Sequence, residues 1–195
     1  MFFSDGDRRE YLNFLKAEAL KNGVEIWAWC LMDNHVHFVA VPSTEEGLAK
    51  SFGDAHKRYT RMINFREKWR GYLWQGRFSS FPMDEAYVFS AVRYMERNPV
   101  EAGLVQKAED YVWSSARAHV YGISDPLLSP NFMTEQIGDW SEYLSKPCDD
   151  EVEAFKGHVK TGRPFGDGNF LSKLEELTGR VLKKAKPGRK PLAIK

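Results

Sequence analysis

The order of apolar patterns along the chain predicts an α+β fold, a ferredoxin-like (RRM-like) α/β sandwich with an antiparallel sheet. Two observations carry this expectation. Residues 24–32 and 35–41 are rich in β-forming residues and are separated by the tight-turn pair Asp33-Asn34, which predicts a hairpin. Helical patterns flank the hairpin, and the order helix, strand, strand, helix, strand, helix is typical of helices packed on one sheet.

The remaining elements follow from local start and stop signals. Asp5 or Asp7 can cap the first helix, and Asn22-Gly23 can end it. The last helix of the sandwich should stop at Asn98-Pro99, because the residue before a proline disfavours the helical conformation. We therefore expect helices over 5–21, 43–68 and 85–97, and a further extended strand over 71–83.

Composition narrows the class of protein. Hydrophobic residues make up 43% and charged residues 28% of the 195 residues, as in an ordinary folded domain, and the net charge of +1 does not by itself require a nucleic-acid partner. The two cysteines, Cys30 and Cys148, exclude a disulfide framework and a four-cysteine zinc site. We expect a reduced, cytoplasmic setting, and no apolar run approaches the ~20 residues of a membrane span.

The composition changes beyond about residue 125, where proline and glycine interrupt short helical pieces. We expect a main domain over 1–125, a helical C-terminal extension over 126–179 and a disordered basic tail over 180–195. The tail contains no acid, and its cations include Lys183, Lys184 and Arg189, which suit contacts to phosphate groups.

The sharpest local feature is the pair His35 and His37 on the second predicted strand. Residues i and i+2 of a strand point to the same face, so the two imidazoles can approach one divalent metal together. Two histidines that lie by chance on a solvent-exposed face of the sheet are equally compatible with the spacing. The apolar residues that follow His37 favour a partly buried strand.

Two residues of the last predicted helix could complete such a site. Asn98 could bind a metal through its amide oxygen, and it lies four residues after Tyr94, on the same helix face. Tyr94 beside a metal would be a candidate nucleophile that needs activation, because the unperturbed pKa of a phenol is about 10. The alternative is that Tyr94 is a core aromatic residue, in step with Tyr87 and Ala91.

A basic and aromatic stretch over 57–77 is the third candidate feature. Cations that meet phosphates, interleaved with aromatic rings that stack on bases, are typical of a single-stranded nucleic-acid groove. A solvated helix face over a core explains the pattern as well. The residues proposed to contact nucleic acid are Lys57, Arg58, Arg61, Arg66, Arg70, Trp74 and Arg77.

Together these stretches resemble a known family. The segment Trp29-Cys30-Leu31-Met32-Asp33-Asn34-His35-Val36-His37-Phe38 resembles the signature of the HUH single-tyrosine transposases, and most closely their REP-associated tyrosine transposase branch. The match continues through 73–78 and 93–105, and more loosely through 113–115 and 161–166. The three main motifs occur in the family's order and spacing.

The resemblance implies a metal-dependent enzyme of the HUH endonuclease type that cleaves and rejoins single-stranded or hairpin DNA, such as a palindromic repeat. By similarity, His35, His37 and Asn98 hold a divalent cation, Mg²⁺ or Mn²⁺, and Tyr94 attacks the phosphate to form a 5′-phosphotyrosine link. It also implies a cytoplasmic, nucleoid-associated protein without a membrane partner.

This sequence differs from the family pattern at its start. The relatives have a strand before the first helix, whereas this chain begins almost at that helix. Without that strand, one edge of the His-bearing strand is unpaired. We therefore expect either that the true gene start lies upstream of this one, or that the exposed edge pairs with a second copy in a homodimer.

Two other functions fit the same residues. The first is a catalytically inactive single-stranded nucleic-acid-binding module of the same fold. The second is an unrelated metal hydrolase in which the His pair activates water and Tyr94 takes no part.

Overall fold

A computed structural model of the chain describes residues 1–146, 155, 157–159 and 161–182, and shows a mixed α/β protein with an antiparallel sheet. The mixed α/β class is therefore confirmed. The first elements are α1 (Asp5–Lys21), β1 (Val24–Leu31), β2 (Val36–Pro42), α2 (Gly47–Glu67) and α3 (Glu85–Glu101). A 3-10 turn follows at Ala108–Asp110, and then α4 (Ala116–Tyr121), α5 (Met133–Gln136), α6 (Trp140–Ser145) and α8 (Gly168–Thr178).

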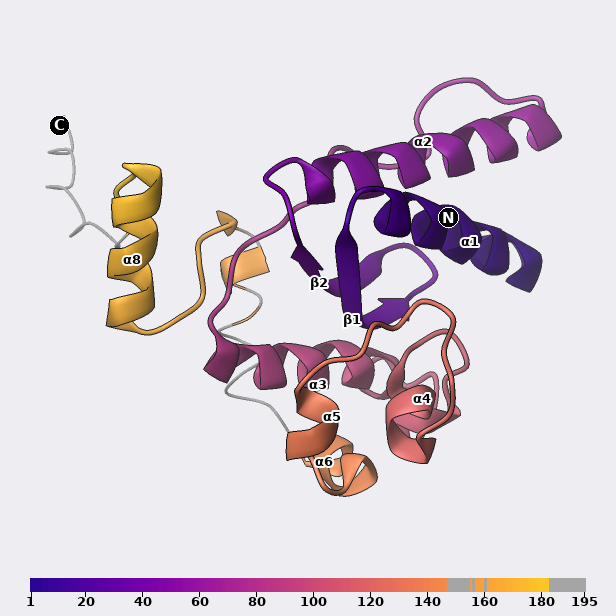
Figure 1. Cartoon of the computed structure of the whole chain (residues 1–195). Coiled ribbons are helices and arrows are strands. Elements are labelled where there is room, and N and C mark those ends of the chain that lie inside the picture. Colours follow the sequence, from indigo (N-terminus) through magenta and orange to yellow (C-terminus); the bar gives the residue numbers. More distant parts are fainter. Residues whose placement is uncertain (147–154, 156, 160, 183–195) are drawn as a thin grey trace, which may run out of the picture.

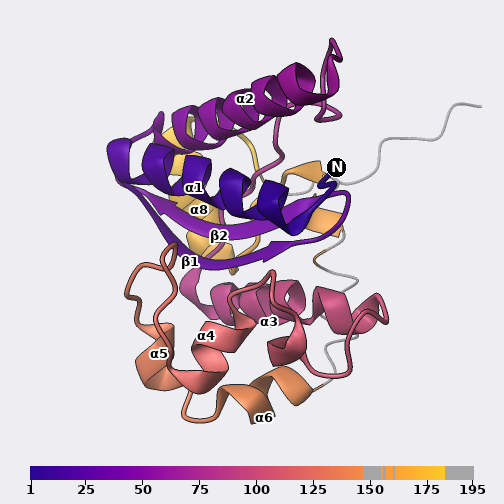
Figure 2. The same cartoon turned by 90° about the vertical axis from the view of Figure 1, so that its right-hand side faces the viewer.

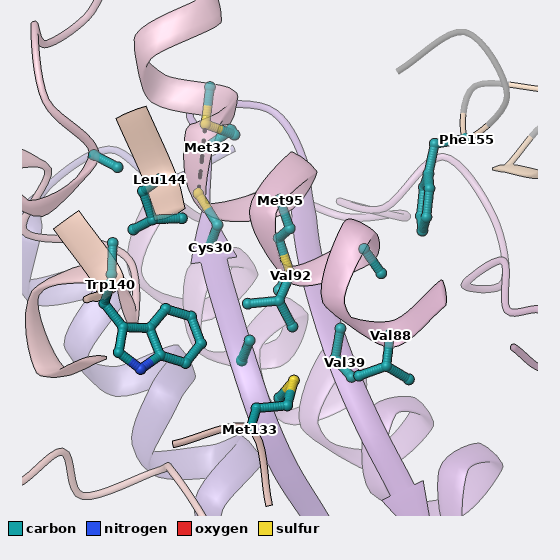
Figure 3. Packing of buried hydrophobic residues seen from close by; sticks show 14 of the residues in the cluster. Cys30, Met32, Val39, Val88, Val92, Met95, Met133, Trp140, Leu144 and Phe155 are labelled. Atoms are coloured by element: carbon teal, nitrogen blue, oxygen red, sulfur yellow. Dashed lines mark hydrogen bonds between the residues drawn. The ribbon is translucent and has the colours of Figure 1, made fainter. Parts of the chain in front are cut away.

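The elements form three layers with the sheet in the middle. Helices α1 and α2 lie on one face of the hairpin, and α3, with α4 and α6 beyond it, lies on the other (Figures 1 and 2). Side chains alternate along β1, so that Trp29 and Leu31 pack toward α1 and α2, whereas Ala28 and Cys30 pack toward α3. Figure 3 shows the cluster on the α3 side. Each face of the two strands is thus buried by helices.

The N-cap of helix α1 is Ser4, one residue before the first of the two predicted caps. The Ser4 hydroxyl accepts a hydrogen bond from the Asp7 backbone N–H at 3.2 Å, so the expectation that Asp5 or Asp7 caps the helix is wrong. Asp7 is instead buried, and its carboxylate pairs with Arg66 of α2. A buried carboxylate needs such a partner, which explains why Asp7 is not available as a cap. The predicted end at Asn22 is confirmed.

The hairpin closes as its turn residues predict. The Met32 N–H donates to the His35 carbonyl at 2.9 Å, and Cys30 of β1 lies opposite His37 of β2. One irregularity in register lies between Ile26 and Ala28. The turn therefore sets which face of the sheet His35 and His37 occupy.

The outer edge of β1 is covered by loop segments from far along the chain. Leu31 N–H donates to the Trp113 carbonyl at 2.8 Å, Ser115 N–H donates to Trp29, and Ser129 N–H donates to Ile26. On the opposite edge of the hairpin, no backbone hydrogen bond joins Val36–Pro42 to any other described segment. Pairing of this β2 edge with a second copy stays a prediction.

The third strand expected over 71–83 is wrong. Within this stretch only Met83 makes an isolated bridge, to Phe165. The apolar side chains of Leu73, Trp74 and Phe78 pack into the cluster beneath α1 and α2 at irregular spacing, and Gly71 has a φ of +106°. Alternation along a strand cannot satisfy this packing, so the stretch is a folded-back loop.

Helix α3 extends past its predicted stop. Pro99 is buried inside the helix, which ends at Glu101 with Ala102 as its C-cap, and Gly103 follows with a φ of +69°. The Asn98 side-chain amide donates to the Tyr94 carbonyl at 2.9 Å, within the turn that proline would otherwise weaken. Asn98 is consequently a residue inside α3 and not one at its end.

Beyond residue 125, α5, α6 and α8 lie within the predicted helical extension. Met133 and Trp140 of this region belong to the cluster between the sheet and α3 (Figure 3). Residues 183–195 of the predicted basic tail lie outside the described part. In the described ranges, no helix has the length and apolar character that a membrane span needs.

A buried polar joint connects the sheet to α3. The Ser115 hydroxyl accepts from the Trp29 N–H at 2.9 Å and donates to a carboxylate oxygen of Glu96, and both side chains are fully buried. His119 Nδ1 lies 2.8 Å from the same carboxylate oxygen, and its ring stacks on Trp140. Because a buried carboxylate is costly unless hydrogen-bonded, this joint fixes how α3 sits on β1.

We predict that Ser115→Ala lowers the free energy of unfolding by about 2 kcal/mol, because it leaves both the Glu96 carboxylate and the Trp29 N–H short of a partner. Urea denaturation measures the change. The control Ser145→Ala alters an exposed hydroxyl on α6 and should shift stability by less than about 0.5 kcal/mol. Equal effects of the two variants would contradict a special role for the joint.

Candidate active site

The structure places His35 and His37 side by side. Their ring centroids are 4.7 Å apart and the rings are perpendicular. His35 ends the turn and His37 lies in β2, next to the α3 side of the sheet. This is the arrangement that the two-residue spacing predicts for a strand.

Both imidazoles are neutral at physiological pH. Burial lowers the pKa of His37 to about 4, with a further contribution from His35, and burial also lowers the pKa of His35. The Nδ1 atom of His35 lies 2.6 Å from the amide oxygen of Asn34, which can only accept, so Nδ1 carries the proton and Nε2 keeps a lone pair. The Nε2 atom of His37 is buried and makes no hydrogen bond within the described part of the chain.

Tyr94 projects from α3 toward this pair. Its ring centroid is 6.1 Å from that of His37, and the two rings meet edge to face. The other neighbour of Tyr94 is Phe155, at 5.2 Å in a stacked arrangement. Asn98 lies one turn further along α3 and donates its amide to the Tyr94 carbonyl, which leaves its side-chain oxygen as an acceptor.

The structure brings His35, His37 and Tyr94 together where β2 faces α3, and Asn98 lies one turn further along the same helix. Among residues 1–146, 155, 157–159 and 161–182, no three His, Cys, Asp or Glu side chains cluster closely enough to hold a metal ion. A cation bound to the His pair would therefore also need an amide, substrate or water oxygen.

The structure describes six of the nine cations predicted to bind DNA. Three of these six pair with acids: Lys57 with Asp54 at 2.8 Å, Arg58 with Glu18 at 2.8 Å, and Arg66 with the buried Asp7. The other three, Arg61, Arg70 and Arg77, are exposed and have no acid partner in the described ranges. Lys183, Lys184 and Arg189 lie outside those ranges.

Trp74 packs inward. Its ring stacks on His56 at a centroid distance of 3.8 Å, and its indole N–H donates to the His56 carbonyl. The Tyr11 hydroxyl lies 3.0 Å from His56 Nε2, so the three rings form one cluster between α1 and α2. One face of the Trp74 ring is therefore already covered within the protein.

The comparison with protein families identifies the family of the chain. The family model for IS200-like transposases matches residues 1–98, a range that includes His35, His37, Tyr94 and Asn98. The chain belongs to the IS200-like transposase family. The resemblance to the single-tyrosine transposases is thus confirmed, and with it a transposase-type, DNA-binding class of enzyme.

Among solved structures, this IS200-like chain is similar to a REP-associated tyrosine transposase bound to a REP hairpin. The identity is 17%, the match covers 65% of this chain and 76% of the other chain, and the TM-score is 0.47. None of the curated proteins compared with this family member matches it.

The sequence assigned no role to three histidines that the structure shows to be hydrogen-bonded. His56 belongs to the Tyr11–Trp74 cluster, His119 bonds the Glu96 carboxylate, and His158 Nδ1 lies 3.0 Å from the Arg163 carbonyl. The side chains that His56 and His119 bond are 45 and 23 positions away in the sequence. No local pattern could have found these two partners.

We predict that His56 makes this transposase-family chain less stable in acid. Burial lowers the folded-state pKa of His56 to about 4 from an ordinary value of 6.5. Between these pH values His56 binds a proton in the unfolded chain but not in the folded chain. The contribution of neutral, buried His56 to the free energy of unfolding is therefore fully present above pH 6.5 and is lost as the pH falls toward 4.

The variant His56→Gln should therefore flatten the dependence of unfolding free energy on pH by up to about 1.4 kcal/mol per pH unit across this window. Denaturant titrations at a series of pH values measure the slope. An unchanged slope would show that His56 is protonated equally in the folded and unfolded states.

Proposed function

We propose that the chain is a metal-dependent DNA strand transferase that cleaves and rejoins single-stranded or hairpin DNA through Tyr94. The observation that carries this proposal is the 6.1 Å separation of the Tyr94 and His37 rings, in a chain of the IS200-like transposase family. The sheet contributes the imidazole pair and α3 contributes the phenol. A nucleophile and a possible cation site therefore meet between two elements of one chain.

Covalent catalysis would proceed in two exchanges at phosphorus. The Tyr94 hydroxyl oxygen bonds to the phosphorus and loses its proton, and the bond from phosphorus to the 3′ oxygen breaks. The released strand takes a proton to become a free 3′-OH, and the other strand stays attached as a 5′-phosphotyrosine. Reversal with a new 3′-OH rejoins DNA, since the phosphodiester energy is kept in the link.

The residues present fit a divalent cation, on which this family generally depends. His37 offers a buried Nε2 atom that has no partner in the described ranges, and both imidazoles are neutral because burial lowers their pKa values. His35 Nε2 and the Asn98 side-chain oxygen would be the other protein ligands. Bound Mg²⁺ or Mn²⁺ would supply Lewis-acid polarisation of the scissile phosphate.

The DNA would lie against the exposed cations of the α2 region. Arg61, Arg70 and Arg77 have no acid partner in the described ranges, which leaves their charges free for phosphates. The paired cations Lys57, Arg58 and Arg66 would contribute less, because binding DNA would first disrupt their ion pairs. The tail cations Lys183, Lys184 and Arg189 would add contacts that are not specific to sequence.

A second candidate function is a DNA-binding module without turnover. The stacking of Phe155 on Tyr94 favours it, because a ring held at 5.2 Å restricts the approach of a phosphate from that side. The two candidates differ in one product, since only the enzyme forms a covalent protein–DNA adduct that survives denaturation.

We predict that Tyr94→Phe abolishes the adduct with hairpin DNA and Mn²⁺ while changing hairpin affinity by only a few-fold, because only the attacking oxygen is removed. Denaturing gel electrophoresis with labelled DNA detects the adduct. The control Tyr87→Phe removes a hydroxyl from another tyrosine of the same helix, whose ring packs against Phe165. This change should leave the adduct intact. An adduct in Tyr94→Phe would assign the nucleophile to another residue. No adduct in the unaltered chain would favour the binding module.

We further predict that His37→Gln removes Mn²⁺ binding near α3. In the unaltered chain, paramagnetic Mn²⁺ should broaden the NMR signals of His35 and Tyr94, and in His37→Gln this broadening should vanish at the same concentration. His158→Gln, a change beside Phe165 outside the proposed site, serves as the control and should keep the effect. Broadening that persists in His37→Gln would show that the pair does not bind the cation.

A further inference from the structure

We propose that four exposed aromatic residues at the C-terminal end of α2 form a stacking surface for single-stranded DNA next to the hairpin. This stacking surface consists of Phe3, Phe65, Trp69 and Tyr72. The inference rests on the proposed DNA function and adds the part of the substrate that this surface would recognise. Its evidence is the exposure of the four rings, the cations among them and their position in the molecule.

The structure separates the aromatic residues of this region into two groups. Tyr59 and Trp74 turn inward and pack around α1 and α2. Phe65 is 89% exposed, Tyr72 is 99% exposed, and Phe3 and Trp69 are about half exposed at 52% and 50%. Apolar rings exposed to this degree at and just after the end of one helix, with Phe3 in contact with Trp69, mark an interaction surface.

Local contacts hold Phe3, Trp69 and the segment that leads to Tyr72. Trp69 N–H donates to the Asn64 carbonyl at 2.9 Å, and the Asn64 side chain donates to the Gly71 carbonyl, which folds the segment before Tyr72 back against α2. The Phe3 and Trp69 rings meet edge to face at 5.6 Å. The part of the surface that these contacts hold, Phe3 and Trp69, loses less conformational entropy when it binds a ligand.

Positive charge surrounds the stacking surface. Arg61, Lys68 and Arg70 are exposed and have no acid partner in the described ranges, and Arg66 lies over the Phe3 ring at 6.0 Å. The nearest acids are already engaged, since Arg66 pairs with both Asp7 and Glu67. Free cations between exposed rings match the alternating phosphates and bases of a single strand.

The stacking surface lies at the same end of the molecule as the turn that carries His35. The N-terminal amine donates to the Asp33 carbonyl at 3.0 Å, Arg8 pairs with Asp33, and Tyr59 of α2 donates to the Met1 carbonyl. Figure 2 shows the N-terminus between the β1–β2 turn and the end of α2. A strand leaving the candidate active site past this turn therefore meets Phe3 and Trp69 next.

The test compares two DNA probes with the full-length protein. One is a blunt hairpin and the other carries a single-stranded flank of about eight nucleotides, within the site size of known single-strand folds. The double variant Phe65→Ala/Tyr72→Ala should bind the flanked hairpin about tenfold more weakly and the blunt hairpin unchanged. Both side chains are exposed, so the fold should tolerate the change. Fluorescence anisotropy measures the affinities.

The matched control is Tyr121→Ala, which removes a half-exposed tyrosine that also lies beside an arginine, but on α4. It should bind both probes as the unaltered chain does. An equal loss for both probes, no loss for either, or a change in oligomeric state with unchanged affinity would overturn the proposal. The last of these would identify a second copy as the occupant.

A direct measurement separates this proposal from the proposed chemistry. Photocrosslinking from a bromouracil in the flank, followed by peptide mapping, should mark residues 65–72, and it requires no cleavage. Tyr94→Phe should crosslink equally well. Marking elsewhere overturns the stacking surface whether or not an adduct forms, and an absent adduct with marking at 65–72 overturns only the strand-transfer chemistry.

Discussion

The structure depends on burying both faces of a two-stranded sheet. A hairpin of two strands is at best marginally stable alone in water, so β1 and β2 need helices on each side. The cluster with α1 and α2 covers one face, and the cluster with α3 covers the other. The Ser115–Glu96 joint and the backbone bonds from Trp113 and Ser115 then fix the edge of β1. The positions of the candidate site residues depend on this packing of helices on both faces of the hairpin.

The side-chain periods of a strand and of a helix together determine which residues face the site. Alternation along β2 turns His37 toward α3, and the 3.6-residue period of α3 turns Tyr94 and Asn98 to one side while Glu96 faces Ser115. The same joint that stabilises the fold therefore sets the position of the phenol relative to the imidazoles. Burial lowers the pKa values of both imidazoles, and their neutral nitrogens are therefore available to a cation.

The sequence predicted the features that depend on short spacings. The hairpin, its turn and the shared face of His35 and His37 all follow from a period of two residues. The failed expectations depended on tertiary contacts: Asp7 pairs with Arg66, the loop over 71–83 packs rings into the α1–α2 cluster, and α3 continues through the buried Pro99. For the same reason the inward position of Trp74 and the outward position of Trp69 and Tyr72 could not be read from their interleaving with cations.

The central claim is that Tyr94 and the His pair act together on one phosphate. The most direct measurement traps the complex with hairpin DNA and Mn²⁺, digests it with protease and nuclease, and identifies the modified peptide by mass spectrometry. The account predicts a nucleotide attached through its 5′ phosphate to Tyr94, together with a free 3′-OH on the released strand. A nucleotide on any other residue, or attachment through a 3′ phosphate, would contradict it.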